Sequence, residues 1–144
     1  MIIRAVIDAN VFASALINPN GPPGQIVRNF LVDKSFTLIG SSAIFEEVRR
    51  CLSYPKVRKL ISGSDAEIET MCQLLEVESE IIEASGYEQS SYPLSLSDSD
   101  DFKYILTALE GKANYIVSGD SDLLTLKEYE GIKILKPRIF LELI

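Results

Sequence analysis

The sequence contains no histidine, and this absence restricts the chemistry open to the chain. Without histidine there is no Ser-His-Asp or Cys-His catalysis and no histidine-bound metal site. If the protein is an enzyme at neutral pH, carboxylates have to do the catalytic work, with or without a metal ion.

Cysteines and long apolar runs are also scarce. Cys51 and Cys72 do not have the spacing of a metal site, and one disulfide would be unusual inside a cell, so we expect buried free thiols. No apolar run approaches the roughly 20 residues that cross a bilayer. The first residues lack a basic start, and Asp8 interrupts their apolar run, which argues against a signal peptide. We therefore expect a cytoplasmic protein.

The chain has fewer basic than acidic side chains. The chain has 14 lysines and arginines against 21 acidic residues, a net charge of −7. Proteins that hold nucleic acid by bulk electrostatics normally show a basic surface, so the charge argues against that class. It does not exclude a site where bound cations reverse the local charge.

The 144 residues have the length and apolar content of one ordinary domain, and we expect a single domain over residues 1–144. Apolar periodicity predicts strands at residues 2–7, 36–39, 81–82, 115–118 and 132–135. It predicts helices at residues 25–33, 43–52, 65–75, 98–109 and 121–129. Residues 18–24 are rich in glycine, proline and asparagine and are expected to form a loop. Strands alternating with helices predict an α/β fold with a largely parallel sheet.

Two acidic residues directly follow predicted strands. Asp8 comes after the first strand, and Asp120 follows the fourth after Ser118 and Gly119. Sites in parallel sheets form outside the carboxyl ends of the strands. The alternative is that each aspartate only caps the helix or turn after it. Two acids at matching ends of two strands favour a site.

Helical spacing separates two neighbouring glutamates. In the helix expected at residues 43–52, the apolar face is centred near Val48. Glu47 lies at the border of this face, whereas Glu46 lies nearly opposite, toward solvent. Glu47 is therefore the better candidate for a buried polar site.

The same spacing ranks the aspartates of the helix expected from residue 98. Asp98 and Asp101 lie on or beside its apolar side, and Asp100 points away. Asp98 is also well placed as an N-cap, and the helix dipole favours Asp101, so capping is a real alternative for both. Asp101 is the stronger functional candidate.

Several carboxylates in one cleft repel one another by several kcal/mol at low effective dielectric. Hard divalent cations with oxygen ligands are the usual compensation. Mg²⁺ or Mn²⁺ in such a cleft could generate hydroxide and stabilise the leaving oxygen of a phosphodiester. The residues alone therefore predict an acidic metal site without naming a substrate.

Four segments, in order, resemble the motifs of PIN-domain proteins. The first, VIDANVFASAL, starts at Val6, and the second, SSAIFEEVRRCLSYPKV, starts at Ser41. The third, DSDDFKYILTAL, starts at Asp98, and the fourth, YIVSGDSDLL, starts at Tyr115. The second segment is similar to one prokaryotic PIN subgroup, the VapC-like toxins of toxin–antitoxin pairs. Each motif is weak alone, but the ordered set is fairly specific.

The resemblance implies a three-layer α/β/α sandwich with a mostly parallel five-stranded sheet, and Mg²⁺- or Mn²⁺-dependent cleavage of RNA. It also implies an antitoxin protein as partner and a homodimer. The positions that match the family's acidic metal-binding and catalytic residues are Asp8, Glu47, Asp101 and Asp120. Asp98 and Asp122 match accessory metal-binding acids, and Asn10 and Ser118 match polar residues that line the site.

Two departures bear on the function. Ser118 stands where many relatives have threonine, which keeps the hydroxyl. The acidic charge leaves open what holds the RNA, for which the sequence offers Arg4, Arg28, Arg49, Arg50, Lys56, Arg58, Lys59 and Lys103. The basic stretch from Arg49 to Lys59 is either a solvated face, a rim that contacts phosphates, or a surface for a protein partner.

Two other functions compete with the nuclease. A PIN fold kept for binding, with weak or no catalysis, is favoured modestly by the negative charge. The other is a phosphate-handling α/β domain of another kind, such as a receiver-like domain or a phosphatase. A receiver would need an acidic pair after the first strand and a lysine after the last strand. Asp8 stands alone there and Lys136 is a weak match, so this alternative ranks last.

Overall fold

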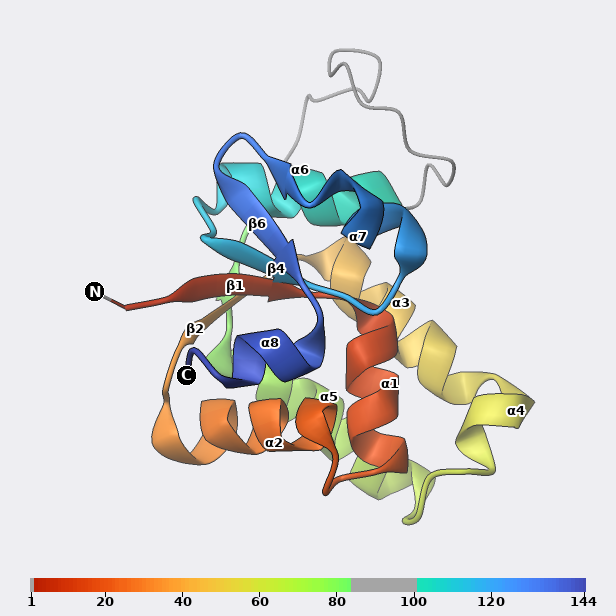
Figure 1. The fold of residues 1–144 in the computed structure, drawn as a ribbon. Helices are drawn as coiled ribbons and strands as arrows, with labels where there is room; N and C mark the ends of the chain where they lie inside the picture. Colours follow the sequence, from red (N-terminus) through yellow and green to blue (C-terminus); the bar gives the residue numbers. More distant parts are fainter. Residues whose placement is uncertain (1, 84–100) are drawn as a thin grey trace.

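The structure, a computed structural model, describes residues 2–83 and 101–144, which form an α/β fold around one sheet (Figure 1). The strands are β1 (Arg4–Ile7), β2 (Thr37–Gly40), β3 (Glu80–Ile81), β4 (Tyr115–Val117), β5 (Glu128–Tyr129) and β6 (Ile132–Leu135). Their order is β3-β2-β1-β4-β6-β5, and every neighbouring pair is parallel except β5 with β6. The mostly parallel sheet is confirmed, but it has six strands where five were predicted, because β5 occupies residues expected to be helical.

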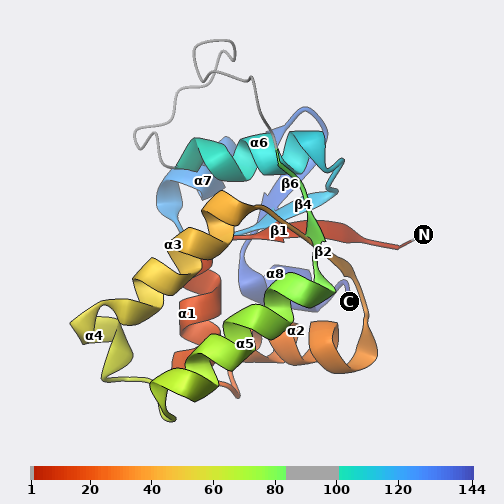
Figure 2. The same ribbon diagram turned by 180° about the vertical axis from the view of Figure 1, so that it is seen from behind.

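Helices cover both faces of this sheet, which confirms the three-layer arrangement (Figures 1 and 2). They are α1 (Ala9–Ile17), α2 (Pro22–Arg28), α3 (Ser42–Ser53), α4 (Pro55–Arg58), α5 (Asp65–Glu78), α6 (Phe102–Glu110), α7 (Ser121–Leu126) and α8 (Pro137–Leu141). In both views α6 and α7 lie on one side of the sheet, and α2, α5 and α8 on the other. None of the helices in the described ranges is long and apolar enough to span a membrane.

The first two helices correct the sequence prediction. No element was predicted for residues 9–17, which form α1. Helix α2 begins at Pro22, inside the expected loop, because prolines in the first turn of a helix lack only an N–H that has no helical partner there. It continues into a π-helical turn, η1 (Asn29–Asp33), which ends at Lys34 in the left-handed conformation.

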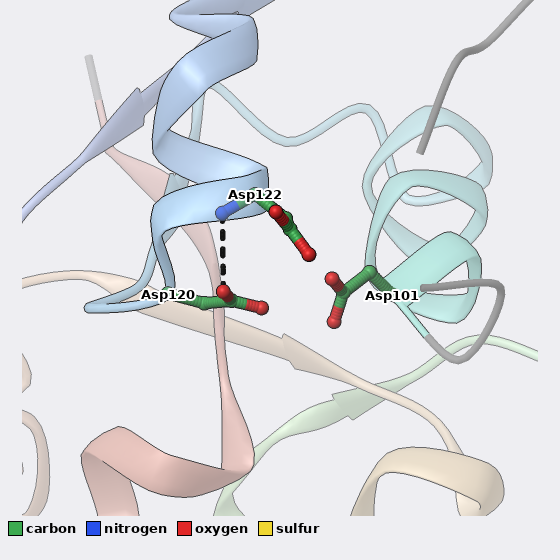
Figure 3. Close-up of side chains that lie close together, drawn as sticks. All are labelled: Asp101, Asp120 and Asp122. Carbon is green, nitrogen blue, oxygen red and sulfur yellow. Dashed lines mark hydrogen bonds between the residues drawn. The ribbon is translucent and has the colours of Figure 1, made fainter. Parts of the chain in front are cut away.

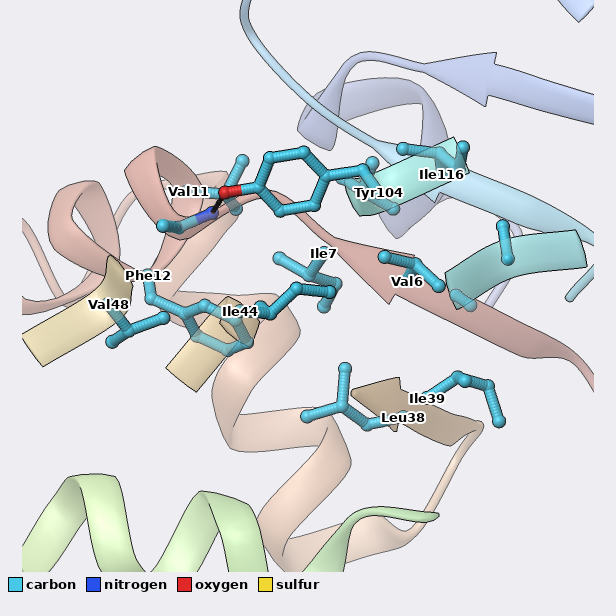
Figure 4. Packing of buried hydrophobic residues seen from close by; sticks show 14 of the residues in the cluster. Val6, Ile7, Val11, Phe12, Leu38, Ile39, Ile44, Val48, Tyr104 and Ile116 are labelled. Atoms are coloured by element: carbon cyan, nitrogen blue, oxygen red, sulfur yellow. Dashed lines mark hydrogen bonds between the residues drawn. The ribbon is translucent and has the colours of Figure 1, made fainter. Parts of the chain in front are cut away.

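Strand β1 runs through the centre of the core. Ala5, Val6 and Ile7 are almost completely buried, as expected for a strand covered on both faces. Around them pack apolar side chains from both helical layers, together with the ring of Tyr104 (Figure 4). Arg4, at the start of the strand, donates to the carbonyl oxygen of Gly111 and pairs with Glu80.

Helix α3 has the amphipathic form that its sequence predicts. The hydroxyl of Ser41 caps it by accepting from the backbone N–H of Ile44 at 3.2 Å. Its apolar face is buried, Glu46 is exposed, and Glu47 is half-buried at the border of that face. Arg49 pairs with Glu69 and Glu76 of α5, which ties these two helices together on the side away from Glu47.

Candidate functional site

The candidate site begins where two central strands end side by side. Strands β1 and β4 are parallel, and Ile7 lies opposite Val117 in their register. The backbone N–H of Asp8 donates to the carbonyl oxygen of Val117 at 2.9 Å, which extends the pairing by one residue. Asp8 and Ser118 therefore emerge together at the carboxyl edge of the sheet, as the strand-end argument predicts.

Three aspartates converge beside this edge (Figure 3). Asp101, Asp120 and Asp122 each offer one carboxylate oxygen, and these three oxygens lie within 4.8 Å of one another. Asp101 is buried and directly precedes α6, while Asp120 and Asp122 belong to the start of α7. Asp101 makes no side-chain capping hydrogen bond to α6, although it lies at the N-terminus of this helix, where the helix dipole favours an acidic residue.

Capping does account for one oxygen of Asp120. Its Oδ1 accepts from the backbone N–H of Asp122 at 3.1 Å, at the start of α7. A carboxylate has two oxygens and about four acceptor positions, so this bond leaves room for a cation. In Figure 3 the other oxygen of Asp120 lies on the side of Asp101. The capping and site interpretations of Asp120 are therefore compatible.

Asp8 is joined to this group through the hydroxyl of Ser118. Its Oδ1 caps α1 by accepting from the N–H of Asn10 at 3.1 Å, and its Oδ2 accepts from Ser118 Oγ at 2.7 Å. Ser118 Oγ accepts in turn from the backbone N–H of Asp120 at 2.9 Å. Since Ser118 is fully buried, its single hydroxyl sets the position of Asp8 relative to Asp120.

Glu47 reaches the site from α3 and is held by two residues of α6. Its Oε2 pairs with Lys103 Nζ at 2.8 Å and accepts a hydrogen bond from the hydroxyl of Tyr104. The same hydroxyl accepts from the backbone N–H of Ala9 at 3.2 Å, directly after Asp8. Glu47 is thus connected to the turn that carries Asp8, although it is not one of the three converging aspartates.

The surroundings change the acidity of several of these groups. Burial raises the pKa of the Asp8 carboxyl, and the charge of Glu47 adds to this, while hydrogen bonds from Ser118 and Asn10 oppose it. Burial and the charge of Asp8 also raise the pKa of the Tyr104 phenol far above its usual value. The phenol therefore stays protonated and acts as a hydrogen-bond donor to Glu47.

The sequence profile of the PIN domain matches residues 4–122. The chain belongs to the PIN-domain family. A relative from Methanocaldococcus jannaschii, the uncharacterized protein MJ1680, is 36% identical over 126 residues, which are 88% of this chain and 76% of that protein. The family assignment confirms the resemblance that the four motifs indicate.

Among solved structures, this PIN domain is similar to the crystal structure of VapBC2 from Rickettsia felis bound to a DNA fragment from their promoter. The TM-score is 0.54, and the match covers 92% of this chain and 97% of that one. The sequences are only 15% identical, so this likeness supports the fold alone.

The converging aspartates of the PIN domain fit a hard divalent cation. Mg²⁺ is bound by oxygen ligands at about 2.1 Å, which puts opposite ligands about 4.2 Å apart. Adjacent ligands of an octahedral ion lie only about 3.0 Å apart. The oxygens of Asp101, Asp120 and Asp122 lie within 4.8 Å of one another, so side-chain shifts of about 1 Å would let all three bind one ion. PIN nucleases as a family use divalent metals, and this all-carboxylate donor set suits Mg²⁺ or Mn²⁺.

The structure thus gives each predicted site residue a place, with one exception. Asp101, Asp120 and Asp122 converge, although Asp122 was expected only as an accessory acid. Ser118 links Asp8 to them, and Glu47 is connected through Tyr104. Asn10 is exposed at the start of α1. Asp98 lies outside the described residues.

Two residues at the site escaped the sequence prediction. Tyr104 was not singled out, although a buried tyrosine hydroxyl usually has a hydrogen-bond partner, which is a usable signal. Lys103 was expected to be available for RNA, but it is ion-paired with Glu47.

Three other basic residues that were expected to be available for RNA form ion pairs within the protein. Arg4, Arg49 and Arg58 form ion pairs with Glu80, with Glu69 and Glu76, and with Asp65, respectively. Within the described ranges no ion pair involves the remaining candidates, Arg28, Arg50, Lys56 and Lys59.

Both cysteines are free thiols, as expected, but only Cys72 is buried. Cys51 is half-buried beside the site, with its Sγ 3.8 Å from Asn10 Oδ1. Burial, with the charges of Glu47 and Asp8, raises the pKa of the Cys51 thiol, so it remains protonated and is a weak nucleophile.

Proposed function

We propose that this PIN domain is a metal-dependent endoribonuclease that hydrolyses phosphodiester bonds of RNA. The observation that carries the proposal is the convergence of Asp101, Asp120 and Asp122, with Asp8 tied to Asp120 through Ser118. Acidic side chains from three separate segments would repel one another without a cation, so their gathering favours a metal site.

Asp101, Asp120 and Asp122 would hold Mg²⁺ or Mn²⁺, with Asp8 and Glu47 as further carboxylates and Asp98 as an accessory acid. The bound ion would supply an activated water and neutralise charge on the phosphodiester in the transition state. Ser118 keeps Asp8 turned toward the site through the 2.7 Å bond to its Oδ2. Of the five carboxylates among these that lie in the described residues, Asp8 and Asp101 are buried, so the residues themselves exclude water from part of the site.

A hollow next to Asp120 supports an approach route for the substrate. A pocket of about 340 Å³ opens beside the site and is lined by Asn10, Val11, Ser14, Pro23, Gly119, Asp120 and Pro137. The exposed amide of Asn10 and hydroxyl of Ser14 offer hydrogen bonds to sugar or phosphate oxygens there. Arg50 near the end of α3, Lys56 in α4 and Lys59 directly after α4 would contribute positive charge to a phosphate-contacting rim.

We further propose that this nuclease is the toxin component of a toxin–antitoxin pair, in line with the VapC-like motifs and the likeness to VapBC2. An apolar groove of about 300 Å³ supports a protein partner. It lies between α1, α2, α3 and α5, and its apolar lining includes Phe12, Leu16, Leu31, Met71 and Leu75. An amphipathic segment of an antitoxin would bury its apolar face there. A homodimer is expected from the family resemblance.

A ribonuclease assay tests the nuclease. The purified protein is incubated with single-stranded and structured RNA in Mn²⁺, in Mg²⁺ and in excess EDTA, beside the Asp8→Asn variant. We expect cleavage by the wild type that requires the ion and stops with EDTA, and at least about 100-fold slower cleavage by the variant, the size seen when site-orienting groups are lost. Equal cleavage by Asp8→Asn, or no cleavage of any RNA with either ion, would contradict the proposal.

The second candidate function is a binding module with little or no catalysis. The net charge of −7 favours it, because an acidic chain holds RNA poorly. Isothermal titration with Mn²⁺ separates the two functions: binding at or below millimolar concentration supports the nuclease, and no binding at millimolar Mn²⁺ supports the binding module.

A further inference from the structure

The hydroxyl of Tyr104 lies where three helices meet. Its ring is 1% exposed and packs in the core above β1 (Figure 4). The hydroxyl bonds to the backbone N–H of Ala9 in α1 and to the carboxylate of Glu47 in α3. One atom of α6 therefore contacts two of the three other segments that carry site acids.

The direction of each hydrogen bond follows from the partners. A backbone N–H can only donate, so the phenolic oxygen accepts from Ala9 at 3.2 Å. An ionised carboxylate can only accept, so the phenol donates its proton to Glu47 Oε2. The hydroxyl therefore both accepts and donates a hydrogen bond within the protein, so its proton is not available for transfer to a substrate.

This arrangement also completes the start of α1. The first N–H groups of a helix have no partner within it. Here the N–H of Asn10 is bound by Asp8 Oδ1 and that of Val11 by the carbonyl oxygen of Asp8. The N–H of Ala9, one residue after Asp8, is bound by Tyr104. The hydroxyl therefore fixes the turn that presents Asp8 at the same time as it fixes Glu47.

The contacts of Tyr104 and Lys103 with Glu47 both involve the same carboxylate oxygen. Tyr104 and Lys103 both contact Oε2, the ammonium at 2.8 Å, and the side chains of Glu47 and Lys103 are each 22% exposed. Within the described parts of the chain no hydrogen bond to Oε1 is formed. Two donors on one oxygen fix the plane of the carboxylate and leave the other oxygen for another ligand.

We propose that Tyr104 is a positioning residue, which holds the carboxylate of Glu47 in fixed register with Asp8 so that Oε1 is available to a divalent cation. The inference rests on the metal-dependent function proposed above. Residues that orient metal ligands through hydrogen bonds typically contribute 10–100-fold to metal affinity or activity. The phenol of Tyr104 would make this contribution without touching either the ion or the RNA.

Tyr104→Phe tests the proposal because it removes only the hydroxyl and keeps the buried ring. Tyr115→Phe is the matched control: Tyr115 lies in β4, its ring packs edge-on against Phe140, and within residues 2–83 and 101–144 its hydroxyl makes no hydrogen bond to a site residue. Mn²⁺ affinity is measured by isothermal titration on each intact protein. We expect about 10-fold or greater weakening in Tyr104→Phe and an unchanged affinity in Tyr115→Phe. Affinity of Tyr104→Phe within about twofold of wild type would overturn the inference.

A second measurement separates positioning from general loss of structure. In EDTA, thermal unfolding is compared for wild type, Tyr104→Phe, Glu47→Ala and the double variant. If the hydroxyl acts through Glu47, removing it lowers the unfolding temperature less in the Glu47→Ala background than in wild type. Equal losses in both backgrounds would contradict the proposal, whatever the metal data show.

RNA cleavage distinguishes this inference from the proposed function. For a positioning residue we expect a lower kcat with a nearly unchanged KM for RNA, because the hydroxyl does not contact substrate. If Tyr104→Phe weakens Mn²⁺ binding but even the wild type cleaves no RNA, the nuclease proposal fails and the positioning role stands. If the wild type binds no Mn²⁺, both fail.

Discussion

Asp8 combines two roles that are often treated as alternatives. One oxygen caps α1, and the other accepts from Ser118 at the carboxyl edge of the sheet. The residue is 3% exposed, so these two bonds have to compensate for most of the water that its carboxylate loses. They do so only in part, since burial still raises its pKa.

The raised pKa predicts how Asp8→Asn changes stability. Because the folded state disfavours ionised Asp8, its carboxylate lowers the stability of the fold at pH values above the raised pKa. This loss of stability disappears as the pH falls toward the ordinary pKa of an aspartate. We therefore expect the free energy of unfolding of the metal-free wild type to fall, relative to that of Asp8→Asn, as the pH rises through the raised pKa. Urea unfolding of both proteins in EDTA between pH 4 and pH 8 measures this, and a difference in stability that stays constant over this range would contradict it.

The two adjacent glutamates of α3 provide a matched pair. Glu47 is held by Lys103 and Tyr104, whereas Glu46 is exposed on the opposite side of the helix. We expect Glu47→Gln to reduce RNA cleavage by about 10–100-fold and Glu46→Gln to leave it nearly unchanged, with both measured as kcat/KM. Similar activities for the two variants would remove Glu47 from the proposed site.

At the scale of elements, the sequence predicts what depends on local pattern. The five expected strands are present, and the hydroxyls of Ser41 and Ser64, which are residues typical of helix starts, cap α3 and α5. Helix α1 was not predicted because five of its nine residues are buried and apolar, so it lacks the polar face that makes a helical period visible. The start of α2 was assigned to a loop because its prolines and glycine are typical of loops.

The same reasoning explains which parts of the site were predictable. Asp8 and Asp120 follow strands, and neighbouring parallel strands end at one edge, so their proximity follows from topology. The contact of Tyr104 with Glu47 and Ala9 depends on how α6 packs against α1 and α3, which no local pattern encodes. The placement of Asp122 beside Asp101 depends in the same way on the angle of α7.

Gly24 shows how tightly the start of helix α2 packs, which the sequence had assigned to a loop. A Cβ built at this residue would lie 2.1 Å from the carbonyl oxygen of Pro19, a backbone atom that cannot rotate away. Gly24→Ala should therefore destabilise the protein by about 2 kcal/mol or more. Gly119→Ala is the control, since nothing lies within 4 Å of its Cβ. Chemical unfolding of both variants measures the difference, and equal stabilities would show that α2 can shift without cost.

At the scale of the whole molecule, the acidic cluster belongs to a chain with a net charge of −7. Binding of a divalent cation would offset the repulsion among the converging aspartates, so metal binding and folding should stabilise each other. The single-domain organisation over residues 1–144 remains a prediction.

Metal binding therefore predicts a rise in thermal stability. An ion that binds only the folded state stabilises it by about 2.7 kcal/mol at a concentration of 100 Kd. We expect Mn²⁺ to raise the unfolding temperature of the wild type, EDTA to reverse the rise, and the Asp101→Asn, Asp120→Asn double variant to show almost none. Differential scanning fluorimetry over a range of Mn²⁺ concentrations measures this, and an equal rise in the double variant would place the ion elsewhere.

The pairing of β1 with β4 has a consequence for the synthesis of this protein on the ribosome. The bond between Ser118 and Asp8 joins residues 110 positions apart, and Asp122 follows later still. Closing so long a loop is entropically unfavourable and slow compared with forming a single helix. A nascent chain that ends before Asp122 carries only part of the cluster, so such an incomplete translation product would lack the assembled site.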